Sequence, residues 1–331
     1  MSDTLKEVFL NLIQSIAKDY TVQLYIAGAV VFTVVVLLII RFRNNDIAME
    51  DDIPEPEEEG NIVENYDFEK PSHMAGILGV GGITVAVVAV LVVYPIIGSY
   101  VEAREEYVDI SYAYTTPVEV NVDEYSSEEI AVNVIPSWYK IDVDFDSLKE
   151  ANPEAVGWIT VDGIDVIDYP IVQADDNDKY LHETFNGTAS SSGAIFLSSD
   201  NSSNFTDGYS IIYGHNMRDG SMFGQLKRFI NEPDFITDTG GYFTVYTPAC
   251  AYRYLIFSVC TLDANDEIYT QAYKNGTDEF TGLLERMISL SQFASDVIPN
   301  ENSRIITLST CSYSDTVRLT VQGMLMERYP Q

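Results

Sequence analysis

Two long stretches without a charged residue divide this chain and limit which parts of it can fold in water. The first covers residues 20–40 and is followed at once by Arg41 and Arg43. The second covers residues 74–101 and has Lys70 before it. Each stretch is long enough to cross a bilayer as a helix. A large water-soluble domain is therefore expected only after residue 101.

The basic residues beside these stretches predict how the chain is oriented. Arg41, Arg43 and Lys70 lie near the two ends of the loop 41–73. Because basic residues beside membrane spans favour the cytoplasmic side, this loop is expected in the cytoplasm. The loop is strongly acidic and should be disordered. The first stretch ends in arginines rather than at a small-residue cleavage site, which disfavours a signal peptide. We expect a multi-pass protein of the cell membrane, with everything after residue 101 outside the cell.

Two further segments complete this N-terminal part. Residues 1–19 carry apolar side chains at helical spacing and are expected to form an amphipathic lead-in to the first span. Residues 102–136 are acidic and show little periodicity, so they are predicted to be an extracellular stalk. The folded domain is then expected to cover residues 137–331.

Charge and cysteine content narrow the possible partners of that domain. From Val101 onward there are 37 acidic against 13 basic residues, a net charge of −24, which makes a nucleic-acid partner very unfavourable. The cysteines are Cys250, Cys260 and Cys311, and their odd number leaves at least one thiol free. Cys250 and Cys260 could pair, but their apolar surroundings favour buried thiols. The sequence has no metal-ligand spacing and no phosphate-binding loop, so neither a metal nor a cofactor is expected.

Short strands separated by turn residues dominate the rest of the chain and are typical of a β-sandwich or barrel. We predict eight strands, at residues 156–161, 166–172, 193–197, 209–213, 241–247, 251–261, 304–310 and 317–326. Helices are predicted at 145–150 and 221–230. A longer one begins at Thr277, with acids in its first turn and an apolar face at 3.6-residue spacing.

Three of the predicted strand ends carry reactive side chains. Cys311 ends one strand, Arg318 begins the next, and His215 follows the strand 209–213. A thiol nucleophile, an imidazole that carries protons and a guanidinium that holds an oxyanion are the parts of an acyl-transfer site. His182 lies beside an acid in a loop-like segment and is expected to be an exposed surface residue.

The order and spacing of these residues resemble those of the sortases, the membrane-anchored cysteine transpeptidases of Gram-positive bacteria. The resemblance rests on the segment Thr307-Leu308-Ser309-Thr310-Cys311 followed by Arg318, and on Tyr213-Gly214-His215-Asn216 before a Met-Phe-x-x-Leu segment. It covers the chain from Trp138 to the C-terminus. A long helical insert between the sixth and seventh strands is most like class B. The family usually has a single anchoring span, so the additional first span at residues 20–40 departs from it.

The resemblance implies an eight-stranded sortase-type barrel with inserted helices, preceded here by the two membrane helices. It makes Cys311, His215 and Arg318 the catalytic residues. Leu308, Ser309 and Thr310 are predicted to contact the substrate. For Ser309, orienting its neighbours is a further possible role, and a strand hydroxyl satisfied by the backbone is nearly as good an interpretation. No cofactor is implied.

The function implied is cleavage of a C-terminal sorting signal after threonine through a thioacyl enzyme. The protein would then be transferred to an amine of a cell-wall precursor or of a pilin. A cell-wall cysteine peptidase is an alternative, but papain-like wall hydrolases place cysteine before histidine, whereas His215 precedes Cys311 here. A catalytically inactive, membrane-tethered binding module is the other alternative, and the presence of all three reactive residues argues against it.

Overall fold

The computed structural model describes residues 94–118, 135–269, 273–311 and 316–331. The chain divides into two compact units, Met1–Ser99 and Tyr100–Gln331. Within the described ranges no helix has both the length and the apolar character needed to cross a bilayer. Two predicted membrane spans lie outside these ranges: the whole of 20–40, and the part of 74–101 up to residue 93.

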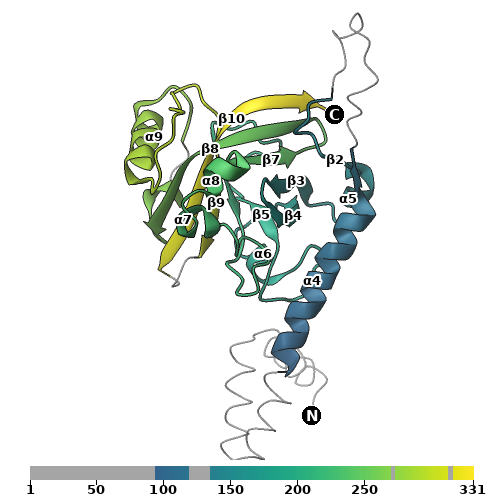
Figure 1. Ribbon diagram of the computed structural model, residues 1–331. Helices are drawn as coiled ribbons and strands as arrows, with labels where there is room; N and C mark the ends of the chain where they lie inside the picture. The colour runs from purple at the N-terminus through teal and green to yellow at the C-terminus, as the bar shows by residue number, and fades with distance from the viewer. Residues whose placement is uncertain (1–93, 119–134, 270–272, 312–315) are drawn as a thin grey trace, which may run out of the picture. The chain divides into compact units, whose positions relative to one another are not determined.

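In the described elements, pairs of consecutive strands are separated by helices (Figure 1). The helices are α4 (Tyr94–Tyr114), α5 (Phe145–Ala151), α6 (Lys179–His182), α7 (Arg228–Asn231), α8 (Phe235–Thr239), the 3₁₀ helix η3 (Glu267–Tyr269) and α9 (Asp278–Leu290). The strands are β1 (Thr115–Pro117), β2 (Ile141–Val143), β3 (Ala155–Val161), β4 (Ile164–Val172), β5 (Ile195–Leu197), β6 (Tyr209–Tyr213), β7 (Tyr242–Tyr246), β8 (Cys250–Asp263), β9 (Ile305–Cys311) and β10 (Val317–Pro330).

Eight of these strands form one sheet that closes into a barrel in the order β10-β8-β7-β3-β4-β5-β6-β9. The eight predicted strands are thus confirmed. The β4–β5 and β6–β9 pairs are parallel and the other pairs are antiparallel. The strands differ widely in length, since β5 has 3 residues whereas β8 and β10 have 14 each. The separate pair β1–β2 lies outside the barrel.

Buried side chains occupy both faces of part of the sheet. The main core includes Trp158, Val245 and Leu308, each fully buried. A second cluster forms where the apolar face of α9, with Phe280 and Leu284, packs together with residues of β6, β8 and β9. The helix predicted from Thr277 is confirmed, and the Thr277 hydroxyl caps it by accepting a hydrogen bond of 3.2 Å from the Phe280 N–H.

Helix α4 changes the expected domain boundary. Residues 102–136 were predicted to be a stalk, yet Ala103, Tyr107 and Ile110 are buried at 3–4% exposure, and Figure 1 shows α4 against the barrel. Their i, i+4, i+7 spacing is an apolar stripe that is too narrow among acidic residues to stand out in the sequence. The compact unit therefore starts at Tyr100 rather than at residue 137. Residues 119–134 of the predicted stalk lie outside the described ranges.

The predicted helix at 221–230 is wrong in its backbone although its packing is right. Met222, Phe223, Leu226 and Phe229 are buried as the pattern implied, but only α7 at the end of this segment is helical. Met222 has a φ of +50° and pairs with Asn216 in an isolated bridge. A left-handed residue cannot continue an α-helix, so no helix runs through Met222, and residues 223–227 form successive turns before α7.

Candidate active site

The register between β9 and β10 brings two of the predicted catalytic residues together. Cys311, the last residue of β9, is the antiparallel partner of Arg318, and Ser309 is the partner of Thr320. The expectation that Cys311 and Arg318 lie on neighbouring strand ends is confirmed for the backbone. The Cys311 side chain lies outside the described part of the structure.

The other neighbour of β9 places the histidine at the same end of the sheet. β6 runs parallel to β9, with Tyr213 opposite Ser309, and the Gly214 N–H donates to the Ser309 carbonyl at 3.1 Å. His215 follows Tyr213 by two residues, as Cys311 follows Ser309. The end of β9 is therefore flanked by His215 on one side and by Arg318 on the other.

Gly214 lets the chain pass close to its neighbours just before the histidine. A Cβ at this position would lie 2.5 Å from Cδ1 of Ile195 and 2.7 Å from Cδ2 of Phe223. Real side chains do not approach this closely, and both neighbours are fully buried. The glycine therefore allows the backbone that leads to His215 to lie against these two core side chains.

The imidazole of His215 is held in one orientation by the backbone. Its Nε2 lies 2.9 Å from the carbonyl oxygen of Leu181. A carbonyl can only accept a hydrogen bond, so Nε2 carries the proton and Nδ1 is the basic nitrogen of the neutral ring. Burial lowers the pKa of His215, and the nearby charges of His182 and Arg318 lower it further, against the Leu181 hydrogen bond that raises it. The ring is thus neutral at neutral pH.

Arg318 is half-buried among groups from three segments of the chain. Its Nη1 donates to the Val317 carbonyl at 3.4 Å, and its charge acts on His215, Tyr213 and Tyr269. Burial raises the pKa of Tyr213 to about 12 and also raises the pKa of Tyr269, while Arg318 opposes both shifts. Both tyrosines are therefore neutral hydroxyls beside a permanent cation.

Tyr213 and Tyr269 were not predicted as site residues. Tyr213 could have been found, because it ends the strand just before His215. Tyr269 comes from η3, and nothing in its local sequence indicates the site. The hydroxyls of Tyr269 and Ser309 share a hydrogen bond of 2.8 Å, which links η3 to the strand that ends at Cys311.

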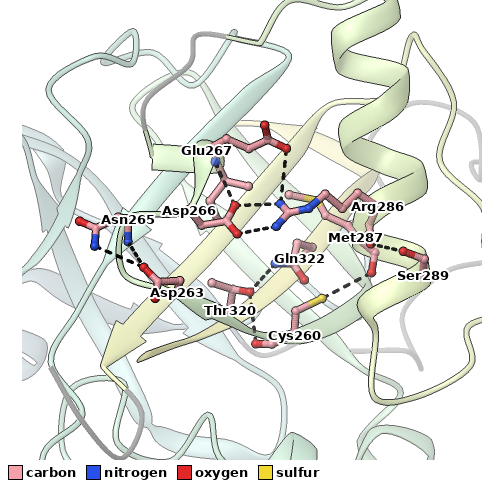
Figure 2. A network of polar contacts seen from close by, with 11 residues as sticks. Cys260, Asp263, Asn265, Asp266, Glu267, Arg286, Met287, Ser289, Thr320 and Gln322 are labelled. Carbon is pink, nitrogen blue, oxygen red and sulfur yellow. Dashed lines mark hydrogen bonds and ion pairs between the residues drawn. The ribbon is translucent and has the colours of Figure 1, made fainter. Parts of the chain in front are cut away.

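An ion pair holds the turn that carries Tyr269. Figure 2 shows the Arg286 guanidinium, from α9, directed at the Asp266 carboxylate, with Nη1 and Oδ1 2.8 Å apart. Arg286 lowers the pKa of Asp266, whose Oδ1 also accepts from the Ile268 N–H at 3.2 Å. The helical insert α9 thereby anchors η3 beside the candidate site.

The three residues predicted to bind substrate lie on β9 and are all buried. Leu308 is fully buried in the main core. Ser309 has 1% of its surface exposed, and Thr310 has 3%. The Thr310 hydroxyl has no hydrogen-bond partner among the described residues. Ser309 is satisfied by a tyrosine hydroxyl rather than by the backbone, and contact of these residues with substrate stays a prediction.

The other two cysteines are unpaired and the second histidine is exposed, as the sequence predicted, although Cys250 is less buried than expected. Cys250 and Cys260 are both free thiols, half-buried and buried respectively. The Cys260 thiol points to the Met287 carbonyl, 3.4 Å away (Figure 2), and burial raises its pKa. The His182 side chain is 70% exposed and lies 3.7 Å from Asp178.

Comparison with known proteins identifies the class to which this fold and site belong. A family model described as the sortase domain matches residues 159–326. Sortase B of Listeria monocytogenes is 36% identical over 185 residues, which cover 55% of this chain and 73% of that protein. The chain belongs to the sortase family.

Solved structures of class B sortases are similar as well. Sortase B from B. anthracis in complex with AAEK1 covers 70% of this chain and 100% of its own at 30% identity, with a TM-score of 0.57. The Staphylococcus aureus sortase B–substrate complex covers 55% of this chain and 84% of its own at 28% identity, with a TM-score of 0.51. The chain is thus a cysteine transpeptidase of the sortase family, similar to class B.

Proposed function

We propose that this protein is a membrane-anchored transpeptidase that cleaves a C-terminal sorting signal after threonine and transfers the secreted protein to an amine. The observation that carries this proposal is the convergence of Cys311, Arg318 and His215 at one end of the barrel, through the β9–β10 and β6–β9 registers. Membership of the sortase family supports the transpeptidase chemistry. The sorting-signal substrate and the amine acceptor are proposed in addition.

The proposed reaction exchanges one amide for another through the thiol of Cys311. The thiolate attacks the carbonyl carbon of the threonine, a C–S bond forms, and the C–N bond to the next residue breaks. His215 takes the thiol proton on Nδ1 as the thiolate forms and delivers it to the leaving amine. The incoming amine then attacks the thioester and the C–S bond breaks, while His215 takes up the proton that the amine loses and returns it to the Cys311 thiolate. No oxidant or metal enters this balance.

Arg318 is proposed to stabilise the negative oxygen of the two tetrahedral intermediates. Its guanidinium is permanently charged and planar, so it can hold an oxyanion with more than one N–H. Its place beside the end of β9 supports this role. The same charge favours the thiolate that forms when the Cys311 proton passes to His215. Burial is the main cause that lowers the pKa of His215, and the Arg318 charge adds to it.

The two uncharged stretches support the proposed anchoring. Residues 20–40 and 74–101 would cross the membrane, with the catalytic domain outside the cell. The acceptor would be an amine of a cell-wall precursor or of a pilin lysine. A weaker proposal is that the acidic surface attracts basic residues near the sorting signal.

The proposal is tested by following adducts of the full-length chain with peptides of the LPxTG, SPxTG and NPxTN types. Mass spectrometry should detect a thioacyl adduct on Cys311 with one of them, and Cys311→Ala should give none. Added amines should convert the adduct into an amide product. Release of only the free acid in the presence of amines would support a cysteine peptidase, and no acylation by any peptide would support a binding module.

A further inference from the structure

Helix α4 contacts the segment between β4 and β5 through one buried hydroxyl. Tyr107 is 3% exposed, and its hydroxyl donates to the Gly193 carbonyl at 2.8 Å. The same oxygen accepts from the Phe185 N–H at 3.2 Å. A single side chain of α4 therefore ties together two points of this segment that are eight residues apart.

The same segment supplies the carbonyl that orients His215. Leu181 lies in α6, and its carbonyl accepts from the Nε2–H of His215. Gly193 packs directly on this backbone, because a Cβ there would lie 2.4 Å from the Tyr180 oxygen and 3.0 Å from the Leu181 oxygen. The Ala194 N–H donates to the Tyr180 carbonyl at 2.9 Å. A displacement of Gly193 would therefore be transmitted to the Leu181 carbonyl.

A second route connects Tyr107 to the turn that follows His215. The Tyr107 ring meets the Tyr169 ring edge-on, with centroids 5.2 Å apart. The Tyr169 hydroxyl accepts from the Met222 N–H at 3.1 Å. The next residue, Phe223, donates its N–H to the His215 carbonyl at 3.0 Å. Tyr107 is thus connected through Gly193 to the segment that holds the ring of His215, and through Tyr169 to the turn that holds its backbone.

A neighbouring residue of α4 strengthens the first contact. The Glu106 carboxylate accepts from the Thr184 hydroxyl at 3.0 Å and from the Asn186 N–H at 3.1 Å. Hydrogen bonds to a charged group are stronger than those between neutral groups. The segment that carries Leu181 is therefore held by two consecutive residues of α4.

We propose that Tyr107 is a positioning residue for His215, so that the helix entering the domain holds the proton carrier in its working tautomer. The inference rests on the proposed catalytic role of His215. If Tyr107 only docks α4, its loss would change stability and leave the imidazole unchanged. If it positions His215, its loss would allow both ring tautomers and slow the reaction.

The test compares Tyr107→Phe with Tyr139→Phe in the full-length chain. Tyr139 is a matched control, since it is 4% exposed and its hydroxyl donates to Asp142 and accepts from Gln331. Nitrogen NMR of the histidine-labelled protein reports the His215 tautomer, with His215→Asn used to assign its signals. Turnover of a sorting-signal peptide reports kcat and KM.

For Tyr107→Phe we expect the signals of both tautomers and a kcat lower by about tenfold, with KM changed less than twofold, because small misplacements of catalytic groups cost rate. Tyr139→Phe should keep one tautomer and the parent kcat. A single tautomer and an unchanged kcat in Tyr107→Phe would overturn the inference.

Two further outcomes remain decisive. If Tyr107→Phe does not fold, Tyr169→Phe, which removes the hydroxyl on the second route, is expected to change the same two readouts, and no change would overturn the inference. If the parent protein acylates no peptide, the proposed function fails, while the NMR readout still tests the positioning of His215.

Discussion

Tyr269 and Ser309 share a hydrogen bond of 2.8 Å that joins η3 to β9, two residues before Cys311. The positive charge of Arg318 also acts on the Tyr269 hydroxyl and lowers its pKa, against the larger effect of burial, which raises it. The pair therefore connects the helical insert, through the Asp266–Arg286 contact, to the strand that carries the proposed nucleophile.

Removal of this hydrogen bond should show strong coupling between its two partners. Tyr269→Phe leaves the buried Ser309 hydroxyl without its tyrosine partner, and each single variant should lose about 1 kcal/mol of unfolding free energy. The double variant with Ser309→Ala should lose clearly less than the sum of the two, as urea unfolding would measure. Additive losses would contradict a direct interaction.

Replacement of Arg318 by lysine should greatly reduce activity although the charge is kept. Lysine lacks the planar fork of N–H donors, and the loss of one oxyanion donor typically costs about 100-fold or more in kcat. The measurement is the rate of thioacyl formation at saturating peptide. Arg328→Lys, on an exposed part of the same strand, is the control and should keep the parent rate. An active Arg318→Lys variant would refute the oxyanion role.

His215 should protonate only below the ordinary histidine pKa of 6.5, because burial lowers its pKa in the folded protein. The unfolded chain then binds this proton more tightly than the folded chain does. The titration of His215 therefore leaves the free energy of unfolding unchanged above pH 6.5 and lowers it as the pH decreases below 6.5.

The stability of His215→Asn should fall less steeply than that of the parent between pH 7 and pH 5, as denaturant unfolding at each pH would show. His182→Asn, with a side chain that is 70% exposed in the parent, is the control. An NMR titration midpoint for His215 above 6.5 would contradict the burial argument.

Leu308→Ala separates a core role from a substrate contact. The side chain is fully buried, so the variant should lose about 2–5 kcal/mol of stability. Leu290→Ala, at a position 44% exposed on α9, should change stability by less than about 0.5 kcal/mol. In the folded fraction KM should stay near the parent value. A large rise in KM with normal stability would favour the predicted contact of Leu308 with substrate.

Local sequence patterns predicted the eight barrel strands and the helix that starts after Thr277, because these features depend on alternation, turn residues and capping within a few residues. The same patterns predicted a helix at 221–230 where successive turns form, since burial of Met222 and Phe223 does not require helical backbone. The three catalytic candidates were found from strand ends and from the resemblance to sortases.

Local patterns were therefore sufficient for the strands and the long insert, and together with the resemblance for the candidates Cys311, His215 and Arg318. Four features became visible only in the folded chain: β6 pairs in parallel with β9, Leu181 orients His215, Tyr269 reaches Ser309, and α4 belongs to the domain. They could not be predicted because each of these contacts joins residues 34 or more positions apart. Their geometry depends on how the barrel closes and not on local propensity.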